Sequence, residues 1–331
     1  SLGSVQRIFA SSSGQGVFRD CKELRKIVFP STLTQLTGQA CYGCESLETV
    51  IMEGATPPSF ESNVFSGTHA NLAIYVPDAS VEAYKTATNW STYASRIYPM
   101  SVYEEGGIEN VITFADPAVE AICLANFDTN GSGVLSKSEA AAVTSIGTVF
   151  KGNTEITSFD ELKYFKNAKI PVGYQSGAFY KCSALTSISL PYGVDLSGGQ
   201  VTSSYIFQDC SSLVSVDGLE GVTGVSEGAF TGAPLTNVLS INMPLLTGVL
   251  RKRTFASMIH SHTVDNLGSI TAIVGTGYNE TVFGRGATLI RLPKTLQSIS
   301  DWAFYHPTSP QLVAIICEAE VPPTITANAF G

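Results

Sequence analysis

The chain has 331 residues, of which 44% are hydrophobic and only 14% are charged, and its formal net charge is −9. This length and hydrophobic content are enough to bury one large core or two modest ones. An acidic chain whose longest basic run is Arg251–Arg253 lacks the basic surface that nucleic acids and anionic membranes attract. Its longest apolar run, Leu312–Cys317, is far shorter than the roughly 18 residues that a membrane span needs.

The first predicted elements belong to a repeat that starts at Phe18. Between Phe18 and Pro30 the sequence reads Phe-x-x-Cys-x-x-Leu-x-x-Ile-x-Phe-Pro, and four of its positions have counterparts 23 residues later, from Cys41 onward. Apolar residues alternate at the end of the repeat, as a short strand requires, and the proline ends that strand. A repeat of this size cannot bury its apolar face alone, so we predict that neighbouring repeats stack into a solenoid.

The residues after the second repeat are predicted to close this stack. A strand stopped by Pro77 is followed by a helix that Asp78 or Ser80 caps and that we expect to end at about Thr88. An aromatic cluster around Trp90 comes next. A strand, a helix and an aromatic plug form a suitable lid, which stacked repeats need for solubility.

Two short helices are expected in the middle of the chain. Residues 101–110 are polar, contain Glu-Glu-Gly-Gly, and are predicted to be a linker. A helix is expected from Pro117 to Phe127 with Asp116 as its N-cap, because proline suits the first helical position. A second helix is predicted over 140–143. The stretch between the two helices fits the pattern of an EF-hand calcium loop.

The predicted calcium loop runs from Asp128 to Glu139. Gly133 stands where the backbone of such a loop turns sharply, and the six ligand positions offer oxygen atoms. The predicted ligands are Asp128, Asn130, Ser132, the carbonyl of Val134, Ser136 and Glu139. Only two of them are charged, so we expect weak Ca²⁺ binding, with a dissociation constant of roughly 10⁻⁴–10⁻³ M. The alternative is a loop that keeps this conformation without binding a metal ion.

A second set of repeats is predicted from about residue 169 onward, with starts at Phe179, Phe207 and Phe230. Near the end of the chain, 322–330 matches 57–65 at a constant offset of 265, and we expect the given chain to end within a repeat. The predicted organisation is a first repeat segment with a lid at 1–100, a linker at 101–110, an EF-hand-like helical cap at 111–168 and a second repeat segment at 169–331.

The repeats at 18–30 and 179–191 resemble the BspA-type leucine-rich repeat, which is found mainly in surface proteins of host-associated anaerobic bacteria and in some protists. The stretch 55–90 resembles the usual end of such an array. The resemblance covers 1–100 and about 170–331. It implies a β-rich, right-handed leucine-rich-repeat solenoid, export from the cell, and a binding or adhesive role without catalysis.

Four other patterns have a chemical interpretation beside a structural one. The segment Gly224–Gly228 matches the nucleophile elbow around Ser226, but it lies where repeats turn between strands. His260 and His262 alternate as metal ligands on a strand would, and we expect instead two exposed loop histidines. The Cys-x-x-Cys pair at 41–44 has the spacing of a redox or zinc half-site, although the repeat already places both cysteines. Aromatic residues that could form a carbohydrate platform, or pack repeats together, are Tyr164, Tyr205, Tyr278 and Trp302.

These observations predict a non-catalytic recognition or adhesion protein that presents its repeat surface to a host or bacterial protein or glycan. We expect it to be secreted or displayed at the bacterial cell surface, and we expect neither nucleic acid as a partner nor a membrane span. The first residue is Ser and no signal peptide is visible, as in a mature secreted protein or a fragment. The alternative is an enzyme or a dockerin-like accessory module of a glycan-degrading system, although dockerins carry two calcium loops and this chain has one.

Overall fold

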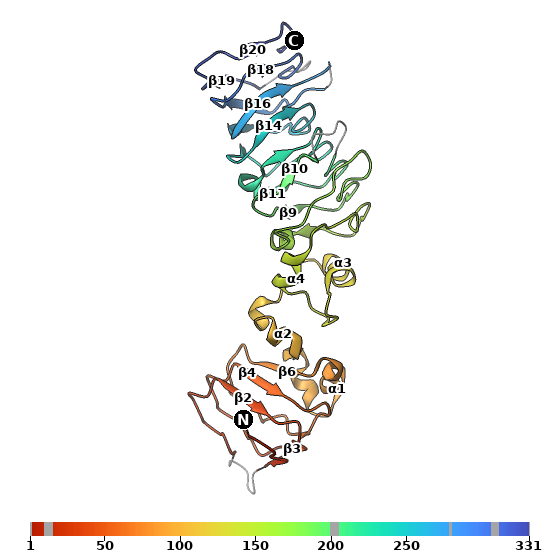
Figure 1. The fold of residues 1–331 in the computed structure, drawn as a ribbon, viewed down its shortest axis with the longest axis vertical. Coiled ribbons are helices and arrows are strands. Elements are labelled where there is room, and N and C mark those ends of the chain that lie inside the picture. The colour runs from red at the N-terminus through yellow and green to blue at the C-terminus, as the bar shows by residue number, and fades with distance from the viewer. Residues whose placement is uncertain (1, 10–15, 199–204, 278–279, 306–310, 331) are drawn as a thin grey trace. The chain divides into compact units, whose positions relative to one another are not determined.

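Figure 1 shows the fold of the chain, a computed structural model that describes residues 2–9, 16–198, 205–277, 280–305 and 311–330. Its contacts divide the chain into two compact units. The first unit comprises residues 1–111 together with 128–136, and the second comprises 112–127 together with 137–331. The predicted helical cap, 111–168, is divided between the two units, because its residues 128–136 are grouped with the first unit.

The first unit is built from two parallel sheets whose strands are supplied by successive repeats. The strands of the smaller sheet are β1 (Arg7–Ile8), β3 (Gln35–Leu36) and β5 (Ser59–Phe60). The strands of the larger sheet are β2 (Lys26–Phe29), β4 (Thr49–Met52), β6 (Ala73–Val76) and β7 (Ile97–Pro99). Lys26 is paired with Thr49, so the 23-residue spacing of the sequence is the spacing between neighbouring strands.

Inward residues of the larger sheet form the core of the first unit, in which Ile27, Val50, Ile74 and Ile97 lie in register. The helical segments of this unit are η1 (Asp78–Ser80), α1 (Val81–Thr86), η2 (Trp90–Arg96), α2 (Met100–Glu104) and η3 (Ile108–Asn110). Trp90 is buried in the core, and its indole N–H donates to the carbonyl of Pro58 at 2.9 Å. The predicted helix after Pro77 ends two residues early, at Thr86, because Ala87 has extended backbone.

The outward face of the same sheet is also apolar, and it is covered. Val28, Ile51, Tyr75 and Tyr98 lie side by side on neighbouring strands. The segment of α2 and η3 packs on them with side chains that include the buried Val102. The tyrosine hydroxyl of Tyr75 accepts the backbone N–H of Ile108 at 3.1 Å. Residues 101–110, predicted to be a polar linker, therefore contain two helical turns that cover a sheet.

The second unit continues the same plan with parallel strands in every pairing between named strands. One side carries β8 (Ser158–Phe159), β9 (Ser187–Ser189) and β11 (Ser215–Asp217), then β13 (Ser240–Asn242), β15 (His262–Asn266), β17 (Ala287–Leu292) and β19 (Ala314–Cys317). Another side carries β10 (Asp195–Leu196) and β12 (Gly224–Val225), then β14 (Thr247–Arg251), β16 (Ser269–Val274), β18 (Ser298–Ile299) and β20 (Thr324–Ile325). Its helical segments are α3 (Pro117–Phe127), α4 (Lys137–Ala142), η4 (Asp160–Tyr164) and η5 (Leu219–Gly221). The chain is thus a strand-rich repeat fold.

A row of phenylalanine rings runs through the second unit, and we call it the phenylalanine ladder. Neighbouring rings lie nearly parallel, with centroids 5.2–6.3 Å apart. Its members are Phe150, Phe179, Phe207, Phe230, Phe255, Phe283, Phe304 and Phe330. The ladder begins at Phe150, so the repeated structure starts earlier than the predicted residue 169.

Three repeat cysteines donate thiol hydrogen bonds to the backbone of the preceding repeat. The thiol of Cys182 donates to the carbonyl of Phe150 at 3.1 Å, and that of Cys210 donates to the carbonyl of Phe179 at 3.0 Å. Cys44 makes the same bond to the carbonyl of Phe18 in the first unit, at 2.9 Å. Each of these carbonyls also accepts a backbone N–H from its own turn, so the thiol supplies a second hydrogen bond, which comes from the next repeat.

Helix α3 packs at the N-terminal end of the second unit. Val119, Cys123 and Phe127 of this helix are buried, and the ring of Phe127 lies 5.4 Å from that of Phe165. Asp116 caps the helix as predicted, since its Oδ1 accepts the backbone N–H groups of the second and third helical residues, at 2.8 and 3.4 Å. None of the helices in the described part of the chain has the length and hydrophobicity that crossing a bilayer requires.

Candidate functional site

The predicted calcium ligands are distributed over both compact units. Asp128, Asn130, Ser132, Val134 and Ser136 belong to the first unit. Glu139 belongs to the second unit, where it is a buried residue of α4.

Within the first unit, residues 128–136 have the internal bonds of a tight turn. Asp128 accepts two backbone N–H groups, that of Ser132 at 3.1 Å through Oδ1 and that of Gly133 at 2.9 Å through Oδ2. Gly133 has a φ of +77°, which is the left-handed conformation expected at the sharp turn of a calcium loop. The hydroxyl of Ser132 donates to the carbonyl of Val134 at 2.8 Å, and Asn130 donates to Glu105 at 2.7 Å.

This local geometry fits an oxygen-ligated cation. The donor atoms on 128–136 are carboxylate, amide, hydroxyl and carbonyl oxygens, which is the set that Ca²⁺ prefers. Ser136 forms an antiparallel bridge with Val111, which gives the single loop a strand partner inside the first unit. Among the residues that the structure describes, no group of three or more His, Cys, Asp or Glu side chains is placed to hold a metal ion. The predicted ligands of this loop are mainly amide, hydroxyl and carbonyl oxygens, and only Asp128 and Glu139 are carboxylates.

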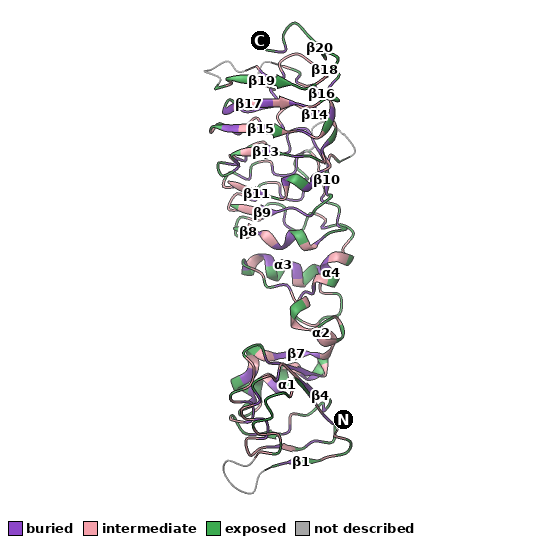
Figure 2. Cartoon of the chain, turned by 90° about the vertical axis from the view of Figure 1, so that its left-hand side faces the viewer, coloured by how far each residue is buried: buried purple, intermediate pink, exposed green. Residues whose placement is uncertain are grey.

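A second candidate site is the open strand face of the second unit, formed by the outward residues of β9, β11, β13, β15 and β17 (Figure 2). Ile188 and Val216 point inward, while the residues before them, Ser187 and Ser215, lie in register on the outside. The outward residues are mostly small and polar, unlike those of the first unit. The polar ones are Ser187, Ser215, Asp217, Ser240, Asn242, Thr263, Asp265 and Arg291, and Leu289 beside Thr263 is aliphatic.

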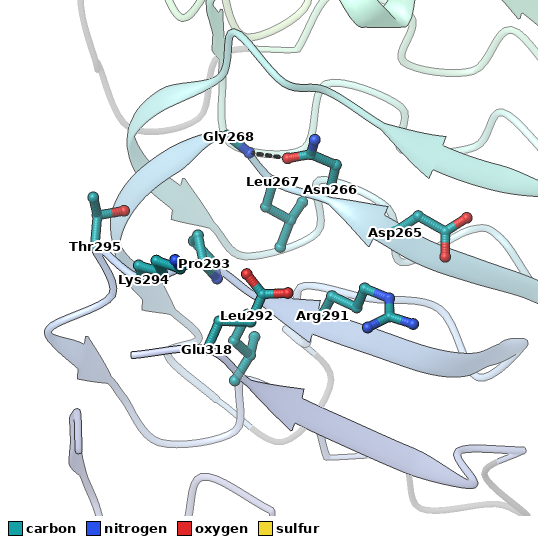
Figure 3. A pocket seen from close by; sticks show the side chains of 10 residues that line it. All are labelled: Asp265, Asn266, Leu267, Gly268, Arg291, Leu292, Pro293, Lys294, Thr295 and Glu318. Atoms are coloured by element: carbon teal, nitrogen blue, oxygen red, sulfur yellow. Dashed lines mark hydrogen bonds between the residues drawn. The ribbon is translucent and has the colours of Figure 1, made fainter. Parts of the chain in front are cut away.

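Two hollows lie along this strand face. The first has a volume of about 460 Å³ and lies over β11 and β13, with Asp217, Glu220 and the exposed Leu239 in its lining. The second has a volume of about 310 Å³, and Figure 3 shows the ten residues that line it. Its charged residues come from three neighbouring strands and the turns that follow them; they are Asp265, Arg291, Lys294 and Glu318.

The charges in the second hollow are available to a ligand. Asp265 is held in place because its Oδ2 accepts the hydroxyls of Ser240 at 2.6 Å and of Thr263 at 3.0 Å. In the described part of the chain, no ion pair joins Arg291 or Lys294 to a carboxylate. The hollow therefore contains two cations, Arg291 and Lys294, that form no ion pair with its carboxylates.

The nucleophile-elbow pattern around Ser226 has a structural cause. Ser226 is only 1% exposed, so no substrate reaches its hydroxyl. Gly228 has a φ of +65°, and a Cβ there would lie 2.0 Å from the ring of Tyr205. This glycine is needed for close packing of a repeat turn and not for catalysis.

The interpretation of the two histidines as exposed loop residues is wrong. His262 is the first residue of β15 and is 2% exposed, and His260 is half-buried just before that strand. The pairing of β15 with β17 shifts register between His262 and Thr263. His262 lies inward as alternation along β15 requires, since Val264 two residues later is also buried. The prediction failed because it placed both histidines on a loop.

The remaining patterns serve packing. Cys41 and Cys44 are buried and form no disulfide. Tyr205 is buried, and the ring of Tyr164 lies under the ammonium groups of Lys137 and Lys163. Trp302 makes an edge contact with Tyr305 at 4.9 Å between centroids. Tyr278 lies outside the described residues.

Comparison with known proteins identifies the repeats. The model of the "BspA type Leucine rich repeat region" matches six copies, over residues 9–88, 143–260 and 174–309. A comparison with curated proteins found no match. Among solved structures, a leucine rich cell surface protein from Faecalibacterium prausnitzii A2-165 is similar, with 17% identity over 92% of this chain and a TM-score of 0.24. This chain spans 62% of that protein's chain, and so low a TM-score supports no argument about the arrangement.

The first match covers β2 to β6 of the first unit, and the other two together extend from residue 143, before Phe150, to residue 309, past Phe304. Together they include more than half of the chain and nearly all of the phenylalanine ladder. The chain therefore belongs to the BspA-type leucine-rich repeat family.

Proposed function

We propose that this chain is a secreted or cell-surface recognition protein, without catalytic activity, that binds a protein partner with the open strand face of its second unit. In this proposal each unit is a right-handed solenoid. The observation that supports it most is the pair of hollows on an outward face, in one of which Arg291 and Lys294 form no ion pair with any described carboxylate. Stacked repeats offer a long, rigid face of this kind, and such faces are suited to binding other macromolecules.

A protein partner is favoured over a glycan by the composition of the face. Glycan platforms need exposed aromatic rings, and neither hollow on the strand face has an aromatic residue in its lining. Leu239 is 67% exposed beside Asp217 and Ser240, and Val313 is 86% exposed before β19. Burial of this exposed aliphatic surface against a protein partner would favour binding.

A binding role is also favoured over hydrolysis. The second hollow contains two carboxylates, Asp265 and Glu318, and a pair of carboxylates is what a glycosidase requires. Both side chains are exposed to water, however. The general acid of a glycosidase is typically a carboxyl group held in an apolar, buried environment. Neither of these two side chains is buried.

The proposal is tested by a binding screen against arrays of extracellular proteins and of glycans, followed by charge reversal. We expect Arg291→Glu to weaken binding to a protein partner by about 1–2 kcal/mol, roughly tenfold. Lys166→Glu is the matched control, because Lys166 is an exposed cation of the same unit away from both hollows. Binding to glycans alone, or protein binding that Arg291→Glu leaves unchanged, contradicts the proposal.

We further infer that the loop from Asp128 to Glu139 binds Ca²⁺ weakly and orders the residues around it. The turn geometry at Asp128 and Gly133 and the ligand spacing of the sequence support this inference. Calorimetry should detect binding in the range of roughly 10⁻⁴–10⁻³ M, and Glu139→Ala should remove it. Absence of binding heat from the unaltered protein at millimolar Ca²⁺ would show that the loop is a structural turn only.

A further inference from the structure

The buried His262 and the half-buried His260 lie next to each other in the second unit. The ring centroids of His260 and His262 are 5.3 Å apart, and the ring planes are inclined by 43°. His260 Nε2 lies 2.9 Å from the carbonyl of Val238, and His262 Nδ1 lies 2.9 Å from the carbonyl of His260. Each ring therefore uses one nitrogen in a hydrogen bond to a backbone oxygen.

These two bonds determine the tautomer of each neutral ring. A carbonyl oxygen only accepts hydrogen bonds, so the nitrogen that faces it must carry the proton. His260 is then protonated at Nε2 and His262 at Nδ1. The remaining nitrogens, Nδ1 of His260 and Nε2 of His262, both carry lone pairs. Both are buried, and neither has a hydrogen-bond partner among the described residues.

Two unsatisfied acceptors in a buried position are costly for a fold, at about 1–3 kcal/mol each. The arrangement is the one that metal-binding histidines have, in which one ring nitrogen donates to a carbonyl and the other is left to bind the ion. The spacing also agrees, since two imidazoles on one tetrahedral ion, with metal–nitrogen distances near 2.0–2.1 Å, have ring centres about 5 Å apart.

We propose that Nδ1 of His260 and Nε2 of His262 together bind one divalent transition-metal cation of the zinc, nickel and copper class. Imidazole nitrogen suits these ions, whereas Ca²⁺ prefers oxygen, so this site is separate from the calcium loop. Two protein ligands leave the coordination of such an ion incomplete, so the affinity is lower than at four-ligand structural zinc sites. The site is independent of the proposed recognition role.

The test is metal binding by the whole chain after removal of bound metals with a chelator. Zn²⁺, Ni²⁺ and Cu²⁺ are titrated separately by calorimetry, and the metal content is measured after gel filtration. We expect one ion per chain for at least one of the three metals. His260→Gln and His262→Gln should each abolish this binding, while His69→Gln, a histidine of the first unit that accepts the N–H of Asn71, should preserve it.

A second measurement remains informative if the variant of the more deeply buried His262 does not fold. Nitrogen-15 correlation spectra of the imidazole rings report the tautomer of each histidine directly. We expect the proton on Nε2 of His260 and on Nδ1 of His262, with a shift of the two other nitrogens on addition of metal. The opposite tautomers, no saturable binding of any of the three metals, or binding that persists in His260→Gln would each overturn the proposal.

Discussion

The thiols of Cys182 and Cys210 are hydrogen-bond donors of the repeat and are not reactive groups. Both are fully buried and donate to a carbonyl oxygen of the preceding repeat. Burial raises the pKa of Cys182 to about 11, and burial likewise raises the pKa of Cys210. Because only the thiolate is a good nucleophile, these cysteines are protected both by burial and by their protonation state.

Alkylation of the native protein should therefore distinguish two classes of cysteine. At about pH 8 iodoacetamide should modify Cys21 and Cys317, which are exposed, and leave Cys182 and Cys210 unmodified. After unfolding in denaturant, all seven should react. Mass spectrometry of tryptic peptides measures both states. Rapid modification of Cys182 in the native protein would show that its thiol bond to the repeat backbone is not maintained.

Asp116 connects the start of α3 to Thr157, just before β8. Its Oδ2 accepts the backbone N–H and the hydroxyl of Thr157, at 2.6 and 2.8 Å, while its Oδ1 caps α3. Burial raises the pKa of this carboxyl, but the hydrogen bonds from Thr157, Ala118 and Ser158 lower it more, so that it lies below its ordinary value. The charged form is thus stabilised by folding.

We expect Asp116→Asn to lower the free energy of unfolding by about 1–3 kcal/mol near neutral pH, because charge-assisted bonds are lost. Because folding lowers the pKa of Asp116, its ionised carboxylate contributes fully to stability above the unfolded-state pKa of about 3.9. This contribution is lost as the pH falls through the lower pKa of the folded protein. The difference between the two proteins should therefore shrink below about pH 4. Urea denaturation across this pH range measures it, with the exposed Asp217→Asn as control. An unchanged difference at low pH would exclude the charge as the cause.

At the scale of elements, the larger sheet of the first unit differs from the strand face of the second because both of its faces are covered. Its strands read Lys-Ile-Val-Phe, Thr-Val-Ile-Met and Ala-Ile-Tyr-Val, which are nearly continuous apolar runs. Strands of this kind are typical of sheets buried on both sides. The cover is the segment of α2 and η3, which the sequence presented as a polar stretch around Gly106 and Gly107.

The attachment of this cover is tested by Tyr75→Phe. The variant keeps the aromatic ring but removes the hydroxyl that accepts the N–H of Ile108, so that a partly buried donor is left without this acceptor. We expect a loss of stability of about 1–2 kcal/mol and faster hydrogen exchange at residue 108. Tyr98→Phe is the control, since its hydroxyl bonds within its own segment, to Ser95. Equal exchange at residue 108 in all three proteins would show that the bond does not hold the cover.

At the scale of the whole molecule, stability depends on contacts between successive repeats. The phenylalanine ladder passes through the second unit from Phe150 to Phe330, and each interior ring has an aromatic neighbour on both sides. In such a stack each repeat is stabilised mainly by the two adjacent repeats. A defect in the middle of the ladder should therefore weaken both neighbours, whereas one at its end should not.

Phenylalanine-to-alanine substitutions at two positions test this expectation. Phe230→Ala removes a fully buried ring and should lower the unfolding free energy by about 3–5 kcal/mol. Phe330→Ala removes a ring that is 52% exposed and should change it by no more than about 0.5 kcal/mol. Thermal and urea unfolding of the two variants give the comparison. Similar losses from both would mean that the ladder is not the shared core.

The repeats were predictable from sequence because their spacing and apolar positions are regular. Cys41 and Cys44 fall at the offset of 23 residues that the strand pairing of Lys26 with Thr49 reproduces. The repeat at Phe150 was missed because Asn153 stands in the cysteine position and the spacing to Phe179 is longer than 23 residues. The signal was present nonetheless, since Phe150, Asn153 and Ile156 keep the three-residue spacing.

The residues of the candidate sites were harder to predict from the sequence than the repeats were. The burial of His262 follows from its place at the start of β15, two residues before the inward Val264, and it was missed because this segment was interpreted as a loop. The residues that line the second hollow, from Asp265 to Glu318, are about 50 positions apart and are joined only by stacking. The calcium loop stays a prediction from a sequence motif, which can be seen in the sequence because its ligand positions lie within one short segment.

The strand face separates two sets of positions that respond to mutation differently. Ile188 and Val216 support the interior, while Ser187 and Ser215 beside them touch solvent and contribute little to it. Substitutions at the solvent positions leave the packing of neighbouring turns intact, so the chain tolerates wide variation there at almost constant stability. In the proposed recognition role, the chemistry of this face can therefore change one side chain at a time without a change in the packed interior.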